Sequence, residues 1–271
     1  MFIKKDSLLL RIISYNGIAI IIVASIMATL FGIMIFNELN MRLLDKSRER
    51  TLLVNKAYLY YIDKSREHLY DASNDAVNLI LVDSNDKLIQ NRLASAVKNQ
   101  LGIESYSLYG KSFIQILSPQ RIVLGESGDR DIKYDLYKTN NVIPSKDFLE
   151  YGKVEYISTE EALYIRIVQP YRLYKSTKRN YIVLTFPLTN YSLSEIKEYA
   201  YLTDEDKVFI LSKDGYLYGE LNSDNTEDFY EIFESNKGSK ELGDNNKYYF
   251  SEKKIGGNDY YLGMLALKNN N

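Results

Sequence analysis

The segment IISYNGIAIIIVASIMATLFGIMIFN, residues 12–37, is a run of twenty-six residues without a charge. A helix needs about 20 apolar residues to cross the hydrocarbon core of a bilayer, so this segment can span it with some tilt. A cleaved signal peptide is the alternative, but its apolar core has roughly 7–15 residues and ends at a cleavage site of small residues. The segment GIMIF at residues 32–36 offers no such site. The sequence therefore predicts an uncleaved membrane anchor.

The charges beside the anchor indicate its orientation. The residues before it carry Lys4, Lys5 and Arg11 against the single anion Asp6, whereas the flank after it carries charges of both signs. An excess of Lys and Arg marks the cytoplasmic side of a membrane span. We therefore expect a cytoplasmic N-terminus in a cell membrane, with the bulk of the chain outside the cytoplasm.

The composition fits a folded domain behind this anchor. Charged residues make up 26% of the chain and the net charge is −2, so bulk electrostatics give no reason to expect a nucleic-acid partner. The chain has no cysteine, which excludes disulfides, cysteine zinc sites and thiol catalysis. Its 25 tyrosines favour strands.

A long helix is expected to follow the anchor, because no glycine or proline occurs between residues 36 and 81. Its upper half has one apolar face, formed by Leu69, Ala72, Ala76 and Leu79. Its lower half has a weaker stripe, through Leu43, Leu53, Ala57 and Tyr60. Such a helix cannot bury itself alone, so we expect it to pair with its twin in a homodimer and with its own domain. A surface helix without a partner is the alternative.

Two sets of shorter elements follow the long helix. The first set has these expected elements: a helix at 87–101 closed by Gly102, strands at 103–109 and 113–117, a weakly structured loop at 118–152, strands at 163–169 and 181–187, and a helix at 190–201. The second set has strands at 207–211, 216–221, 247–253 and 260–267, with a helix at 226–235. This order predicts two consecutive α+β modules.

Three local motifs carry a resemblance to a known family. FPL at residues 186–188 ends a strand and leads into a helix that begins TNYSL, VFILSKDGYLYG at 208–219 is a strand, Asp-Gly turn and strand, and IGGNDYYLG at 255–263 forms a final hairpin. With the long helix directly after a first span, residues 38–268 resemble the double Cache sensor modules of bacterial membrane receptors.

The resemblance implies a PAS-like antiparallel sheet in each module, with ligand bound in the membrane-distal one. The fold class is then α+β, with a transmembrane helix, a long stalk helix and two Cache-like modules. The implied domains are a cytoplasmic N-terminus (1–11), the transmembrane helix (12–37), the stalk helix (38–81), the distal module (82–200), the proximal module (201–268) and a tail (269–271).

The sequence departs from the family in two ways that matter for function. It ends at residue 271 without a second span, so we expect a fragment of a longer receptor whose output region is missing. It has no tryptophan, so the tryptophan-containing amino-acid-binding pattern of one subgroup is absent.

No catalytic motif is found. The single histidine, His68, lacks a phosphoacceptor context and is expected to be a polar position on the long helix. The phosphate-binding glycine patterns and G-x-S-x-G are missing, and a zinc site would need three carboxylates. Glu160 and Glu161 are adjacent, so on a strand they would point to opposite faces. We predict no enzyme activity in this chain, no metal site and no cofactor.

Four residues are candidates for ligand binding. Alternation on the strand at 163–169 places Arg166 beside Tyr164 on one face, where an arginine could hold a carboxylate or phosphate. Tyr106 and Tyr171 could form pocket walls with hydroxyl groups. Alternatively, Arg166 faces solvent or pairs with Glu155.

The sequence thus predicts the extracytoplasmic ligand-sensing region of a signal-transduction receptor. The resemblance implies a two-component sensor histidine kinase, with a chemoreceptor as the alternative. The expected partners are a small-molecule ligand or a partner protein outside the cytoplasm, the membrane, and a second copy of the chain. A membrane-tethered envelope protein with a structural or binding role is the rival from another class.

Overall fold

The computed structural model describes residues 3–79, 86–172, 179–212, 216–219, 242–244, 248–255 and 260–267. The expected helix at 226–235 and the expected turns at 213–215 and 256–259 lie outside these residues. The chain forms two compact units, Met1–Ser47 and Arg48–Asn271.

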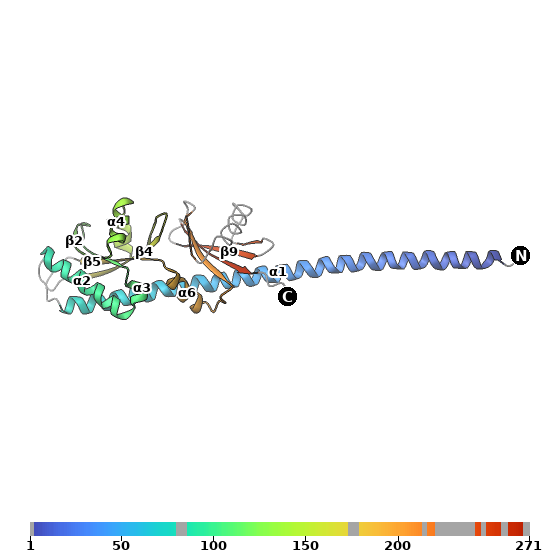
Figure 1. Cartoon of the computed structure of the whole chain (residues 1–271), viewed down its shortest axis with the longest axis horizontal. Coiled ribbons are helices and arrows are strands. Elements are labelled where there is room, and N and C mark those ends of the chain that lie inside the picture. The colour runs from blue at the N-terminus through green and yellow to red at the C-terminus, as the bar shows by residue number, and fades with distance from the viewer. Residues whose placement is uncertain are drawn as a thin grey trace. The chain divides into compact units, whose positions relative to one another are not determined.

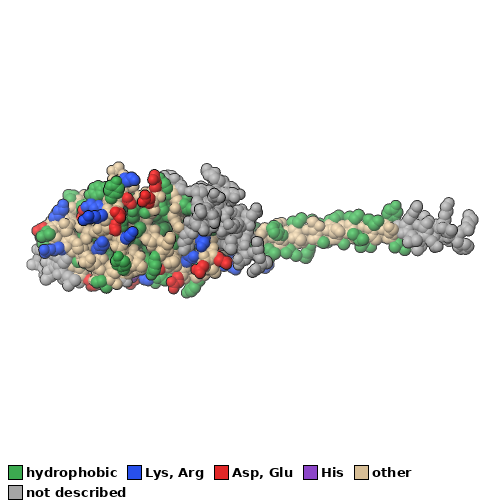
Figure 2. Space-filling view, in the orientation of Figure 1, with side chains coloured by type: hydrophobic (Ala, Val, Ile, Leu, Met, Phe, Trp, Pro, Cys, Tyr) green, Lys and Arg blue, Asp and Glu red, His purple; other side chains and the backbone are tan. Residues whose placement is uncertain are grey.

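The first unit is helical throughout its described part. It belongs to α1 (Ile3–Leu79), and its apolar segment is the one described helix that is long and apolar enough to cross a membrane. The large apolar side chains of this segment, such as Ile20, Phe31 and Met34, are exposed (Figure 2). Exposure on all sides suits a helix surrounded by lipid.

In the second unit, one face of α1 is buried. The buried positions recur every three or four residues: Val54, Ala57, Tyr58, Tyr61, Ile62, Leu69, Ala72 and Ala76. The apolar face predicted for the upper half is confirmed at Leu69, Ala72 and Ala76. Of the stripe predicted for the lower half, Ala57 is buried within this chain, whereas Leu53 and Tyr60 are exposed. Two tyrosines with paired hydroxyl groups, Tyr58 and Tyr61, also lie on the buried face.

The first sheet is antiparallel, with strand order β2-β1-β5-β4-β3. Its strands are β1 (Phe113–Leu117), β2 (Val123–Gly128), β3 (Glu155–Ser158), β4 (Leu163–Arg172) and β5 (Arg179–Pro187). Helix α2 (Lys87–Glu104) packs against β1 and β2 (Figure 1). A Cβ atom on Gly125 would collide with the backbone of Gln90, so glycine is required where α2 approaches β2.

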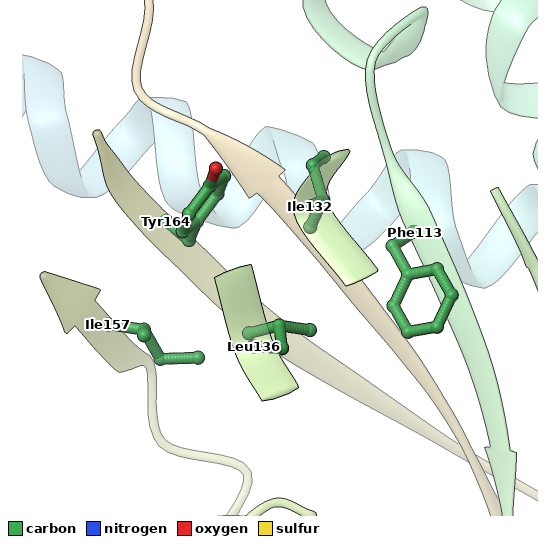
Figure 3. Packing of buried hydrophobic residues seen from close by; sticks show 5 residues of the cluster. All are labelled: Phe113, Ile132, Leu136, Ile157 and Tyr164. Carbon is green, nitrogen blue, oxygen red and sulfur yellow. The ribbon is translucent and has the colours of Figure 1, made fainter. Parts of the chain in front are cut away.

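Two short helices cover the other face of this sheet. α4 (Arg130–Lys138) begins at the N-cap Asp129, and α5 (Lys146–Tyr151) begins at the N-cap Ser145 and ends at Gly152 with a left-handed backbone. The prediction of a weakly structured loop at 118–152 is therefore wrong. The segment contains β2, and Asp129, Ser145 and Gly152, which are residue types common in loops, are helix caps. Figure 3 shows the core that results, which contains Phe113, Ile132, Leu136, Ile157 and Tyr164.

The strand predicted at 103–109 is also wrong. α2 continues through Gly102 to Glu104, Ser105 is extended, and residues Tyr106–Tyr109 form the short helix α3. The buried side chains of this region are Leu101, Leu108 and Tyr109. The alternation of polar and apolar residues in IESYSLY was too short to distinguish a strand from the end of one helix and a second short helix.

The second sheet is antiparallel as well, with strand order β7-β6-β10-β9-β8. Its strands are β6 (Lys207–Ser212), β7 (Leu217–Gly219), β8 (Leu242–Asp244), β9 (Tyr248–Ile255) and β10 (Tyr260–Leu267). α6 (Asn190–Tyr199) precedes this sheet and begins with a capping box formed by Thr189 and Ser192. The predicted fold class, a long apolar N-terminal helix followed by two antiparallel sheets, is confirmed.

Replacement of Gly263 by alanine should destabilise the second sheet. An added Cβ atom would overlap the ring of Phe209, which lies opposite on β6. Overpacking of this kind costs about 1–3 kcal/mol. The free energy of unfolding of the full chain in detergent micelles, measured by chemical denaturation, should fall by that amount.

The matched control is Gly102→Ala in α2, where an added Cβ atom meets nothing within 4 Å. It should leave stability unchanged or raise it by up to about 1 kcal/mol, because alanine favours a helix over glycine. Equal effects of the two substitutions would contradict the packing argument.

Candidate functional site

The first sheet places Arg166 in a row of facing residues. On β4 it lies opposite Glu155 of β3 and opposite Thr185 of β5, and Thr185 in turn lies opposite Phe113 of β1. Directly opposite residues in an antiparallel sheet share a face. Arg166 therefore lies on the face that α4 and α5 cover.

The guanidinium of Arg166 is enclosed by internal acceptors. The side chain is 1% exposed. Its Nη1 lies 2.7 Å from Oε2 of Glu155, its Nη2 donates to the carbonyl oxygen of Asn141 at 2.6 Å, and its Nε donates to Oγ1 of Thr185 at 3.3 Å. Burial lowers the pKa of Arg166 below its usual value, and the carboxylate of Glu155 offsets part of this effect. The pairing with Glu155 that the sequence left open as an alternative is present.

Tyr164 lies on the same face as Arg166, two residues earlier on β4. Its hydroxyl group donates a hydrogen bond to the carboxylate of Asp135 on α4. Burial, followed by the hydrogen bond and the negative charge of Asp135, raises the pKa of Tyr164 well above its usual value. The structure thus brings Tyr164 and Arg166 together on one face, as predicted.

The other two predicted site residues lie elsewhere. Tyr171 alternates to the opposite face of β4, where its hydroxyl group donates to Oε1 of Gln90 at 3.0 Å. Burial raises the pKa of Tyr171 to about 12. Tyr106 lies on α3 and is 79% exposed. Neither residue shares the sheet face of Arg166.

An open cleft of about 660 Å³ lies beside Tyr164. One wall comes from α4, with Asp131, Tyr134, Asp135 and Lys138 spaced at i, i+3, i+4 and i+7. These residues form one face of α4, since residues three and four apart are neighbours on a helix. The other face of α4 places Ile132 and Leu136 in the core (Figure 3).

The turn between β3 and β4 forms a second wall. Glu160 and Glu161 lie at its tip, and Thr159 and Ala162 close it by the backbone bond from Thr159 N to Ala162 O at 2.9 Å. The hydroxyl group of Tyr218 on β7 donates to the carbonyl oxygen of Thr159. The two glutamates are therefore in a fixed turn, and not on a strand as the sequence argument assumed.

Tyr216, which immediately precedes β7, also lines the cleft. Its backbone is fixed by two bonds with Ser212, in which Tyr216 N donates to Oγ at 3.0 Å and Ser212 N donates to the carbonyl oxygen of Tyr216 at 2.8 Å. Sequence reasoning missed the acidic lining because α4 was expected to be a loop. The spacing of Asp131, Asp135 and Lys138 was the available signal.

The structure also bears on metal binding and on His68. Among the described residues, no group of three or more His, Cys, Asp or Glu side chains is arranged to hold a metal ion. His68 is half-buried on α1, with its Nδ1 3.2 Å from the hydroxyl oxygen of Tyr109. Burial and the nearby charge of Lys64 lower the pKa of His68.

Several solved structures are similar to this chain. The periplasmic domain of LuxQ from Vibrio cholerae aligns with a TM-score of 0.55 and 12% identity, over 83% of this chain and 100% of that domain. The chain therefore has the same fold as the periplasmic domain of LuxQ. The sensor domain of the V. cholerae histidine kinase DctB aligns with a TM-score of 0.45 and 9% identity, over 84% of this chain and 98% of that domain.

The ligand-binding domain of the Pseudomonas aeruginosa amino-acid chemoreceptor PctB aligns with a TM-score of 0.45 and 13% identity, over 84% of this chain and 88% of that domain. No family model matches the sequence, and no curated protein sequence matches it. The likeness to LuxQ is thus one of fold.

Replacement of Arg166 by methionine should destabilise the first sheet by about 3 kcal/mol, because it leaves Oε2 of Glu155 and the Asn141 carbonyl without their partner. The measurement is the free energy of unfolding of the full chain in detergent micelles. Arg172→Met, at the exposed end of the same strand, is the matched control and should change it by less than about 0.5 kcal/mol. A loss of similar size in both variants would refute a specific role for the buried ion pair.

Proposed function

We propose that this chain is the extracytoplasmic ligand-sensing region of a membrane signal-transduction receptor. In this proposal the apolar segment of α1 spans the membrane, the N-terminus lies in the cytoplasm, and the two sheets lie outside. The shared fold with a periplasmic domain and the membrane-compatible helix support this arrangement. The cytoplasmic output is a histidine kinase or a chemotaxis region carried by another part of the receptor.

The observation that carries the proposal is the double role of α1. One helix, Ile3–Leu79, contains both the apolar segment and a face buried in the second unit. A ligand that favours one arrangement of the sheets also favours one position of this face. Signalling by a shift of a helix needs no chemistry in the sensing region.

Specific polar bonds join α1 to both sheets. The hydroxyl groups of Tyr58 and Tyr156 share a hydrogen bond, and Tyr156 lies on β3. Nη1 of Arg50 lies 2.9 Å from Oδ1 of Asp206, the residue just before β6. The side chain of Asp206 is only 3% exposed. A movement of either sheet would therefore break these bonds or displace α1 with the sheet.

We further propose the domain limits given by the sequence. β1 to β5 fall within the distal module at 82–200, and β6 to β10 fall within the proximal module at 201–268. Residues 1–11 would be cytoplasmic, 12–37 would span the membrane, and 38–81 would form the stalk.

The topology can be tested with single cysteines, because the chain contains none of its own. Lys111→Cys, at an exposed position beside β1, should react with a membrane-impermeant maleimide on intact cells. Ser7→Cys should react only after permeabilisation, since residues 1–11 are proposed to be cytoplasmic. Labelling of Ser7→Cys but not Lys111→Cys in intact cells would overturn the proposed orientation.

A homodimer through the long helix is part of the proposal. Within the second unit, the outward face of α1 exposes Leu52, Leu53, Leu59 and Tyr60, with Leu59 52% exposed. Leu52 and Leu59 are seven residues apart and lie on one stripe, as in paired helices.

Leu59→Cys should therefore form a disulfide-linked dimer under mild oxidation in membranes, visible as a doubled mass on a non-reducing gel. Lys111→Cys, which is exposed but does not belong to α1, should stay monomeric under the same conditions. Equal dimer yields for the two variants would argue against pairing along α1.

A further inference from the structure

The cleft beside Tyr164 has the size of a small-molecule site. Its volume of about 660 Å³ lies within the range of roughly 300–1,000 Å³ that is usual for such sites. It lies beside the core cluster of the first sheet, and Tyr164 belongs to both. Its walls are the outer face of α4, the tip of the β3–β4 turn and Tyr216.

The charge of the lining is mostly negative. Four carboxylates, those of Asp131, Asp135, Glu160 and Glu161, line the cleft against one cation, Lys138. None of the ion pairs recorded among the described residues involves these four carboxylates. In Figure 2 acidic side chains gather over the region of α4. Such a cleft concentrates cations from solution.

Aromatic rings complement these charges. Tyr134 is 67% exposed and projects from the same face of α4 as the two aspartates, and Tyr216 contributes a ring from the residue just before β7. Tyrosine faces attract ammonium groups within about 6 Å of the ring centroid. An organic cation with apolar methylene groups can therefore use both the carboxylates and the rings.

The distribution of the carboxylates favours an organic cation over a metal ion as the ligand. Two carboxylates belong to α4 and two to the turn, and no three acidic groups of the described residues gather closely enough to hold a metal. Separated negative charges match a ligand whose positive charges are also separated. An aliphatic diamine or polyamine has this property.

We propose that the cleft binds an aliphatic polyamine, with its ammonium groups at the carboxylates of α4 and of the β3–β4 turn and its methylene groups against the tyrosines. This deepens the proposed function, on which it rests for the side of the membrane that the cleft faces. Because Tyr216 immediately precedes β7 of the second sheet, a bound polyamine adds contacts between the two modules. The ligand thereby favours the arrangement in which the cleft is closed around it.

Calorimetric titration of the full chain in detergent micelles with spermidine, at physiological salt, tests the proposal. Wild-type protein should bind spermidine and should not bind an uncharged diol of the same chain length. The variant Glu160→Gln with Glu161→Gln should bind spermidine about tenfold more weakly, since it loses two charged contacts in a partly enclosed cleft. Tyr134→Leu should weaken binding severalfold.

The control variant, Glu198→Gln with Glu205→Gln, removes two exposed carboxylates outside the cleft and should bind within about twofold of wild type. Absence of spermidine binding overturns the proposal. So does equal weakening by the control variant, equal binding of the diol, or unchanged binding after the substitutions at Glu160 and Glu161.

The outcome is separable from that of the proposed function. Cysteine labelling that places Lys111 outside the cell, together with failure of spermidine to bind, refutes the polyamine site and leaves the receptor proposal standing. Binding that depends on Glu160 and Glu161, in a chain with the opposite topology, supports the cleft and refutes the receptor proposal.

Discussion

The burial of one face of α1 is the constraint on which the second unit depends. A helix with a solvent-exposed outer face gains little stability alone. The apolar face of α1 and the apolar faces of the sheets are therefore buried only when they pack against each other. The buried tyrosines make this dependence specific. The hydroxyl groups of Tyr58 and Tyr61 are paired, with Tyr156 and Ser192 respectively, and an unpaired buried hydroxyl would be costly. The helix therefore has one rotational position that satisfies both its apolar and its polar groups.

Electrostatic interactions fix the first sheet in a comparable way. A buried ion pair such as that of Arg166 and Glu155 adds little net stability compared with apolar residues of the same volume, because desolvation offsets the attraction. Its contribution is geometric. Arg166 has donors directed at β3, at β5 and at the backbone after α4, so these three segments cannot move apart without leaving a buried charge unpaired.

The sequence predicted the central strands and the α+β class well, because long runs of apolar and β-branched residues are unambiguous. It failed at α4, where capping residues resembled loop residues. It placed Arg166 and Tyr164 on one face correctly, because alternation decides that within a strand. It did not show that β4 continues past Pro170, which is tolerated because β4 has a neighbouring strand on only one side beyond Arg166. The sequence also did not predict that Glu160 lies across the cleft from α4, because α4 itself was not predicted.

The ten residues of β4 make three different connections, and this limits how the strand can move. Tyr164 reaches α4, Arg166 reaches β3 and β5, and Tyr171 reaches α2 from the reverse side. Sliding by one position would exchange the two faces, and sliding by two would preserve the faces but separate every pair. β4 is therefore held in a single register, and a rearrangement that keeps these bonds must move β4 together with α2, α4, β3 and β5.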